Sequence, residues 1–108
     1  MPLPTAAFRA LADETRRDIL VMLRSGPRTS GEIAVKFHSS WPTISRHLAV
    51  LRDAGLVLTE RRGQEIHYEL NTSVFQDLAQ YLMGWVKPGV PPRAGRARTP
   101  RSSRPQEG

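Results

Sequence analysis

Residues 41–52 read WPTISRHLAVLR, and this stretch decides the fold of the chain. Stepping 100° per residue from Ile44 places Leu48 and Leu51 within about 40° of it, which predicts the buried stripe of an amphipathic helix. The opposite side carries hydroxyls beside an arginine, where a merely solvated helix face usually holds Glu and Lys. We therefore predict that this side contacts another molecule. Its residues are Thr43, Ser45 and Arg46.

Another helix is expected directly before this one. The sequence TSGE, from Thr29 to Glu32, is a capping-box pattern in which the two side chains satisfy each other's backbone donors. After the short break HSS, Ser40 can cap the next helix, and Pro42 fits its first turn because the missing N–H costs little there. The second helix of this pair is expected to span residues 41–54.

Two further helices are predicted nearer the N-terminus. Thr5 can cap a short one, and Asp13 can cap another in which apolar residues recur at helical spacing. Gly26 suits the left-handed position after that helix, and Pro27 bars its continuation. Arg16 lies on the apolar side of this helix, so we interpret it as a structural ion-pair partner.

A β-hairpin is predicted after the helix pair. The segments LVLTERR and EIHYEL are separated by a Gly-Gln turn at residues 63–64, and apolar and polar residues alternate in the second segment. In the first segment, either Val57 or Leu58 could face inward. The tip of the hairpin is rich in arginine.

The last predicted helix begins with the capping-box pattern SVFQ at residues 73–76 and runs to about Val86. Its apolar residues cover roughly 200° of the helix wheel, whereas packing on one core needs a stripe of about 100°. The surplus apolar surface predicts contact with a second copy of this chain across a two-fold axis. The alternative is an oversized core within a monomer. The residues expected in the dimer interface are Phe8, Leu11, Val74, Phe75, Leu78, Tyr81, Leu82 and Trp85.

The chain of 108 residues is expected to form one domain over residues 1–86, followed by a tail over residues 87–108. Residues 1–85 hold ten Arg or Lys against nine Asp or Glu, whereas the rest holds six against one. The Pro, Gly and Arg content of the tail cannot support a core, which predicts disorder. The basic tail either contributes to nonspecific binding of a partner or is an inert solubilising segment.

The composition also bounds the location and the chemistry. The absence of cysteine excludes disulfides and thiolate metal sites. No apolar run approaches a membrane span, and MPLPTAAFRA lacks the hydrophobic centre of a signal peptide. We therefore expect a soluble cytoplasmic protein without membrane insertion.

The order of these elements predicts a mainly α fold with a small β-hairpin: four helices, the hairpin and a fifth helix. A tight helix pair followed by an Arg-tipped hairpin is the order of the winged helix-turn-helix, in which the second helix of the pair lies in the major groove of DNA. The segments FRALADETRRDILVML, WPTISRHLAVLRDAGLV and GQEIHYELN resemble the ArsR family of bacterial repressors, and LNTSVFQDLAQYLMGW resembles the end of its SdpR-type autorepressors.

This resemblance implies a homodimer that binds an inverted-repeat operator, often its own promoter, and represses transcription. The family's metal sensors bind metal through cysteines that correspond to GEIAVKF here, or through Asp and His on the last helix, where this chain offers Asp77 alone. We therefore expect neither metal site, and no other cofactor is predicted. For SdpR-type proteins the family also suggests a membrane partner that relieves repression.

Candidate DNA contacts fall into three groups. On the second helix of the pair, an arginine fork can pair with guanine and a hydroxyl can meet any base; Trp41 is either a contact or a hydrophobic lid, and His47 is either packed or bonded to phosphate. Side chains at the start of the preceding helix can meet a phosphate, and those at the hairpin tip either reach DNA or are merely solvated. The full set is Arg28, Thr29, Ser30, Trp41, Thr43, Ser45, Arg46, His47, Arg61, Arg62 and Gln64.

Two other classes of function compete with DNA binding. An enzyme would need convergent acids and bases or a nucleophile, and the sequence has no paired carboxylates, nucleophile motif or phosphate-cradling glycine loop. A winged-helix module that binds another protein is the alternative that stays open, since the same fold can present its exposed helix to either partner. An apolar outer face would favour that alternative, whereas hydroxyls with an arginine favour DNA.

Overall fold

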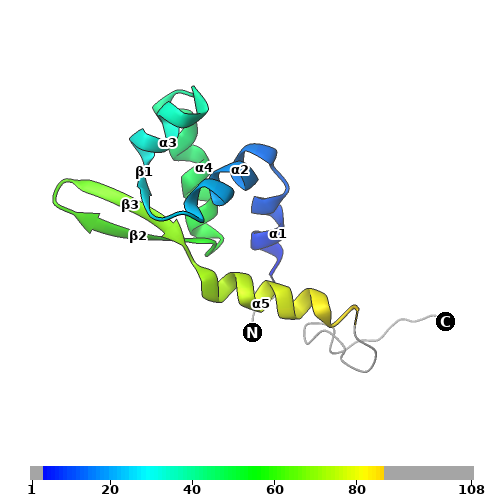
Figure 1. The fold of residues 1–108 in the computed structure, drawn as a ribbon. Helices are drawn as coiled ribbons and strands as arrows, with labels where there is room; N and C mark the ends of the chain where they lie inside the picture. Colours follow the sequence, from blue (N-terminus) through cyan, green and yellow to red (C-terminus); the bar gives the residue numbers. More distant parts are fainter. Residues whose placement is uncertain (1–3, 87–108) are drawn as a thin grey trace. The chain divides into compact units, whose positions relative to one another are not determined.

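The structure is a computed structural model that describes residues 4–86 (Figure 1). The expected tail over residues 87–108 therefore lies outside the described residues. Two compact units are distinguished, one over Thr5–Val74 and another that contains residues 75–86. The elements in chain order are α1 (Thr5–Leu11), α2 (Glu14–Leu23), β1 (Arg28–Thr29), α3 (Ser30–Phe37), α4 (Trp41–Asp53), β2 (Val57–Arg62), β3 (Glu65–Leu70) and α5 (Thr72–Met83).

Three of the predicted caps, Asp13, Thr29 and Ser40, define helices of the first unit. Asp13 accepts a hydrogen bond from the backbone N–H of Arg16 at 3.0 Å, and the positive φ of Gly26 (136°) ends the segment after α2. Thr29 forms a complete capping box at the start of α3, and Ser40 caps α4. The structure confirms these helix boundaries. They could be predicted because each capping side chain bonds backbone groups close to it in the sequence.

The core of the first unit lies between the helices and the base of the sheet. The inner stripe of α4, predicted from its spacing, is fully buried at Ile44, Leu48 and Leu51. Buried side chains from α2, α3 and the start of β2 complete this core, and α3 and α4 pack side by side (Figure 1). Burying one such aliphatic side chain contributes about 1.5–3 kcal/mol, so this stripe holds α4 in place.

The sheet has three antiparallel strands in the order β1-β3-β2, one more than the predicted hairpin. The added strand pairs Arg28 with Tyr68 and Thr29 with His67. A strand of two residues carries no alternation pattern, so only its tertiary pairing reveals it. In β2 the side chain of Val57 is buried and that of Leu58 is 47% exposed, which settles the register that the sequence left open.

Two predicted helix starts are corrected. The helix α1 includes Thr5 as its first residue, so Thr5 is not its cap, and α5 begins at Thr72, before the expected cap Ser73. The second difference has a tertiary cause, because Asn71 is anchored just before α5. Its backbone N–H donates to Leu56 O at 3.0 Å and its side chain donates to Gly55 O at 3.0 Å. The C-terminal end of α5 is Met83, earlier than the expected Val86.

Candidate nucleic-acid interface

The outer face of α4 presents two polar side chains that the fold leaves unused. Ser45 and Arg46 are both exposed, while Ile44 on the inner side is fully buried. Within residues 4–86, neither the Ser45 nor the Arg46 side chain forms a hydrogen bond or an ion pair. An unpaired guanidinium beside a hydroxyl can donate to acceptors on another molecule, including the edge of a base.

The start of α4 is tied to the start of α3 by polar side chains. The indole Nε1 of Trp41 donates to Ser30 Oγ at 2.6 Å, and Ser40 Oγ donates to Thr43 Oγ1 at 2.9 Å. Trp41 is 63% exposed, so it is not a buried hydrophobic lid. The two helix starts therefore form one polar edge that includes three predicted DNA contacts, Ser30, Trp41 and Thr43.

The capping box of α3 occupies part of the predicted phosphate-binding group. The backbone N–H of Thr29 donates to Glu32 Oε1 at 2.8 Å, and Glu32 N donates to Thr29 Oγ1 at 3.2 Å. These bonds, led by the one from the Thr29 N–H, lower the pKa of the Glu32 carboxyl. Both the backbone donor and the hydroxyl of Thr29 are therefore engaged by Glu32 in this conformation.

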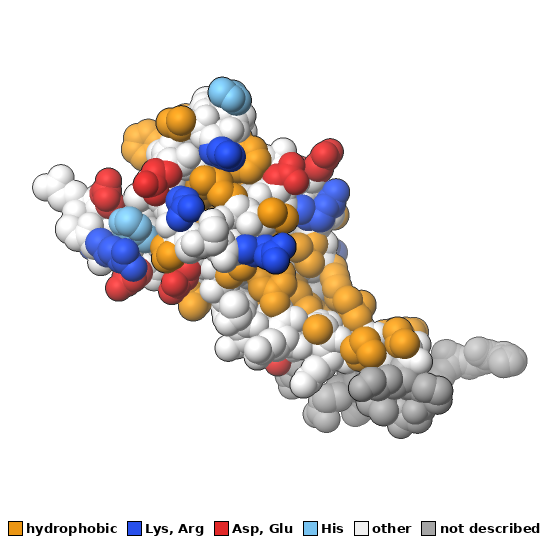
Figure 2. All heavy atoms as spheres, viewed as in Figure 1, with side chains coloured by type: hydrophobic (Ala, Val, Ile, Leu, Met, Phe, Trp, Pro, Cys, Tyr) orange, Lys and Arg blue, Asp and Glu red, His pale blue; other side chains and the backbone are white. Residues whose placement is uncertain are grey.

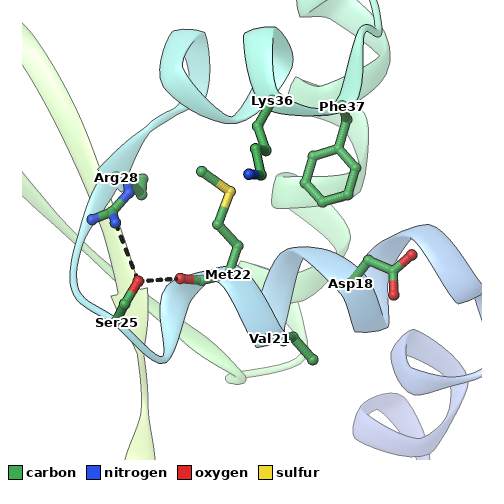
Figure 3. A pocket seen from close by; sticks show the side chains of 7 residues that line it. All are labelled: Asp18, Val21, Met22, Ser25, Arg28, Lys36 and Phe37. Carbon is green, nitrogen blue, oxygen red and sulfur yellow. Dashed lines mark hydrogen bonds between the residues drawn. The ribbon is translucent and has the colours of Figure 1, made fainter.

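Arg28 lines an open hollow between α2 and α3, with its side chain directed toward Ser25 (Figure 3). Its guanidinium donates to Pro27 O at 2.9 Å and to Ser25 Oγ at 3.1 Å. The hollow measures about 620 Å³, and Val21, Met22 and Phe37 give it apolar walls. Arg28 is thus engaged by the turn before β1 in this conformation and would have to release it to reach a phosphate. The other lining residues are Asp18 and Lys36.

The hairpin tip mixes charges of both signs, as the interspersed basic and acidic side chains in Figure 2 show. Arg61 and Gln64 are exposed, but Arg62 is paired with Glu60 at 3.0 Å. His67 lies 3.6 Å from Glu65 on the same strand. Of the predicted contacts at the tip, Arg61 is thus the arginine without an ion pair in the described part of the chain.

His47 is half-buried, with its Nδ1 atom 3.4 Å from Nη1 of Arg16. The predicted structural role of Arg16 is found, but its partners are not carboxylates. Its side chain donates to Ala10 O at 2.8 Å and to Arg9 O at 3.2 Å, so the ion-pair interpretation is wrong. The inward position of Arg16 follows from helical spacing, whereas a partner 31 residues away has no sequence signal.

The dimer candidates differ in exposure. On the last helix and the turn after it, Leu82 is 50% exposed and Trp85 is 70% exposed, whereas Leu78 is buried. Val74, Phe75 and Tyr81 are half-buried, as are Phe8 and Leu11 in the first helix.

No cluster of three or more His, Asp or Glu side chains with metal-binding geometry occurs within residues 4–86. The helices of that part of the chain also include none that is both long and apolar enough to cross a membrane.

Comparison with known proteins decides the family. The profile described as "Bacterial regulatory protein, arsR family" matches residues 13–59. The transcriptional repressor SdpR of Bacillus subtilis (strain 168) is 43% identical over 82 residues, which make up 76% of this chain and 91% of SdpR. The chain belongs to the ArsR family of bacterial regulatory proteins. Another relative, the arsenical resistance operon repressor of Escherichia coli (strain K12), is 40% identical over 67% of this chain and 62% of its own length.

Solved structures of an ArsR-like regulator and of a possible ArsR-family regulator share the fold. An ArsR-like transcriptional regulator from Rhodococcus sp. RHA1 superposes with a TM-score of 0.69 at 31% identity, covering 74% of this chain and 76% of the other. A homodimeric winged helix-turn-helix DNA-binding domain from Mycobacterium bovis gives a TM-score of 0.64 at 30% identity, covering 76% and 75%. The predicted family and the winged helix-turn-helix fold are confirmed. In this fold α3 and α4 are the helix pair and β2–β3 is the wing.

Proposed function

We propose that the protein is a transcriptional repressor that binds an inverted-repeat operator as a homodimer, with α4 in the major groove and the wing at the minor groove. The observation that carries this proposal is the outer face of α4, where Ser45 and Arg46 are exposed and unpaired within the described residues. An arginine fork can bond two acceptors of guanine, and a hydroxyl can bond any base. The relatives SdpR and the Escherichia coli arsenical protein are both named as repressors, which supports repression as the outcome of binding.

Each group of predicted contacts has a role in this proposal. Ser45 and Arg46 read base edges, while Thr43 and Trp41 line the approach to them. The start of α3 binds phosphate through the hydroxyls of Thr29 and Ser30, since a helix N-terminus favours anions. The remaining contacts, which fix the position of the protein on the duplex, are Arg28, His47, Arg61, Arg62 and Gln64.

The homodimer is supported by the apolar side chains that α5 and the following turn leave exposed. Leu82, Met83 and Trp85 are 41–70% exposed, and large apolar side chains close together in the sequence at the end of a helix and in the turn after it favour a protein partner over water. The Mycobacterium bovis domain named above is homodimeric. A two-fold dimer presents two copies of α4, which is what an inverted-repeat operator requires.

The repressor is further proposed to act in the cytoplasm and without a metal signal at the sites known in this family. The segment GEIAVKF supplies no cysteine, and the last helix supplies Asp77 without a histidine. The signal that releases the operator would then be of another kind, such as binding of a protein partner.

The decisive experiment is a gel shift with the upstream region of the gene, comparing the wild type with Arg46→Ala and Ser45→Ala. Loss of the specific complex in a folded variant supports the groove assignment. Arg52→Ala is the matched control, because Arg52 lies on the same helix but is paired with Asp53 at 3.3 Å. If the variants at positions 45 and 46 bind as well as wild type, α4 is not the reading helix, and a protein-binding module becomes the better interpretation.

The basic tail is proposed to add nonspecific affinity, because residues 87–108 carry six basic residues against one acidic residue. Each cation that neutralises a phosphate steepens the fall of affinity with salt. Removing residues 88–108 is expected to flatten the plot of log affinity against log salt concentration. An unchanged slope would leave the tail as a solubilising segment.

A further inference from the structure

The C-terminal end of α1 is closed by two consecutive arginines from α2. Arg16 donates through Nε to Ala10 O at 2.8 Å and through Nη2 to Arg9 O at 3.2 Å. Arg17 donates through Nη1 to Leu11 O at 2.8 Å. The last carbonyls of a helix lack intrahelical partners, and the helix dipole favours cations there. Both arginines therefore cap the same helix end.

The two arginines differ in what else they touch. Arg16 is half-buried, and its Nη1 lies 3.4 Å from Nδ1 of His47 in the middle of α4. Arg17 is exposed, and among the described residues its side chain bonds α1 alone. A guanidinium can only donate, so Nδ1 is the acceptor and the proton of the neutral ring lies on Nε2. Arg16 therefore links α1 to α4 and fixes the tautomer of His47.

Asp13 completes this cluster at the start of α2. Its carboxylate accepts from the backbone N–H of Arg16 at 3.0 Å, and this bond is the main cause of the lowered pKa of Asp13. The positive charge of the Arg16 guanidinium lowers that pKa further. The cluster joins the end of α1, the start of α2 and the middle of α4, and both α1 and α2 pack on α4.

We propose that Arg16 is a positioning residue for the reading of DNA by α4. This inference rests on the proposed function, because it assigns a role in that function to a residue that faces away from the DNA. His47 follows Arg46 directly in the chain, so a bond that holds the His47 ring also sets the rotation of α4 that presents Arg46. Recognition side chains need support of this kind, because small displacements cost much of their specific affinity. Arg17, with the same charge and the same capping role, lacks the link.

The test compares Arg16→Ala with Arg17→Ala in the full chain. A duplex is first enriched from a random pool by the wild type, and the affinity of each variant is measured for that duplex and for a scrambled one. Arg16→Ala is expected to lose about tenfold or more on the enriched duplex, and Arg17→Ala about twofold. On the scrambled duplex both are expected to lose alike, since each removes one cation. Equal losses on the enriched duplex overturn the inference.

A double-mutant cycle between Arg16→Ala and His47→Gln separates positioning from general stability. If Arg16 acts through His47, the two losses on the enriched duplex are non-additive by about threefold or more. Additive losses overturn the inference. Should circular dichroism show Arg16→Ala to be unfolded, the cycle is run with Arg16→Lys, which keeps the charge but cannot span all three acceptors. If the wild type enriches no duplex, the proposed function itself is overturned. If it enriches one but the variants behave alike, only the inference about Arg16 is overturned, so the two failures can be distinguished.

Discussion

The helix α4 and the wing β2–β3 both carry arginines toward solvent, but they hold them differently. Arg46 on α4 is unpaired within the described residues, whereas Arg62 on β2 is bound to Glu60 at 3.0 Å. Residues two apart share a face of a strand, so Glu60 lies where it can neutralise Arg62. On a helix the neighbours are three and four residues away, and around Arg46 none of those is acidic: they are Pro42, Thr43, Ala49 and Val50.

This difference shows that the spacing of carboxylates decides which arginines remain available. The guanidinium of Arg46 on α4 stays unpaired among the described residues, and the wing balances part of its charge internally. Under the proposed function we expect such a wing to add position and modest affinity, and α4 to carry the discrimination between bases.

The largest expected effect is on the free energy of unfolding, which a substitution on α4 should lower far more than a matched substitution on the wing. Leu48→Ala removes a fully buried side chain of α4 and is expected to lower the free energy of unfolding by about 2–5 kcal/mol. The matched change on the wing, Leu58→Ala, removes a side chain that is 47% exposed and is expected to cost within about 0.5 kcal/mol. Urea denaturation of both variants measures the difference, and similar costs would contradict the assignment of the core to α4.

A smaller effect concerns DNA affinity. Arg46→Ala is expected to lose about 1–3 kcal/mol on the operator and to relax the preference for one base pair. Arg62→Ala is expected to lose much less, because its charge is already balanced by Glu60. Fluorescence anisotropy with operator and single-base variants measures both quantities. A loss for Arg62→Ala as large as that for Arg46→Ala would remove the distinction between reader and wing.

The ion pair on the wing offers a gain-of-affinity test. Glu60→Gln removes the carboxylate beside Arg62, so we expect tighter nonspecific binding by about twofold and a salt slope steeper by about one. Titration of a scrambled duplex at several salt concentrations gives both values. If affinity and slope do not change, Arg62 does not approach phosphate even when its charge is released.

The smallest effect concerns pH and the capping box that starts the helix pair. The pKa of Glu32 is lowered from its ordinary value of 4.5 by the Thr29 N–H, so the unfolded chain takes up this proton at higher pH than the folded one. The resulting stabilisation is present above pH 4.5 and is lost as the pH falls through the lowered folded pKa. Glu32→Gln keeps the capping geometry and is expected to reduce the fall of the melting temperature at acid pH. An identical fall in the variant would show that Glu32 does not contribute to it.

Most of the fold could be predicted because its signals are local. The capping residues Asp13, Thr29 and Ser40 act within three residues of their partners, and the inner stripe of α4 repeats at helical spacing. The polar face of α4 follows from the same geometry, so the predicted Arg46 and Ser45 are found outward. These features needed only the chain's own periodicity.

The tertiary structure alone decided the contacts between distant segments. The pairing of β1 with β3, the inward register of Val57 and the start of α5 all depend on partners that no local pattern names. The same holds for the link from Arg16 to His47, two residues 31 positions apart. A sequence fixes which side of an element is apolar, because that depends on spacing, but the partner of an inward polar group depends on which elements the packed core brings together.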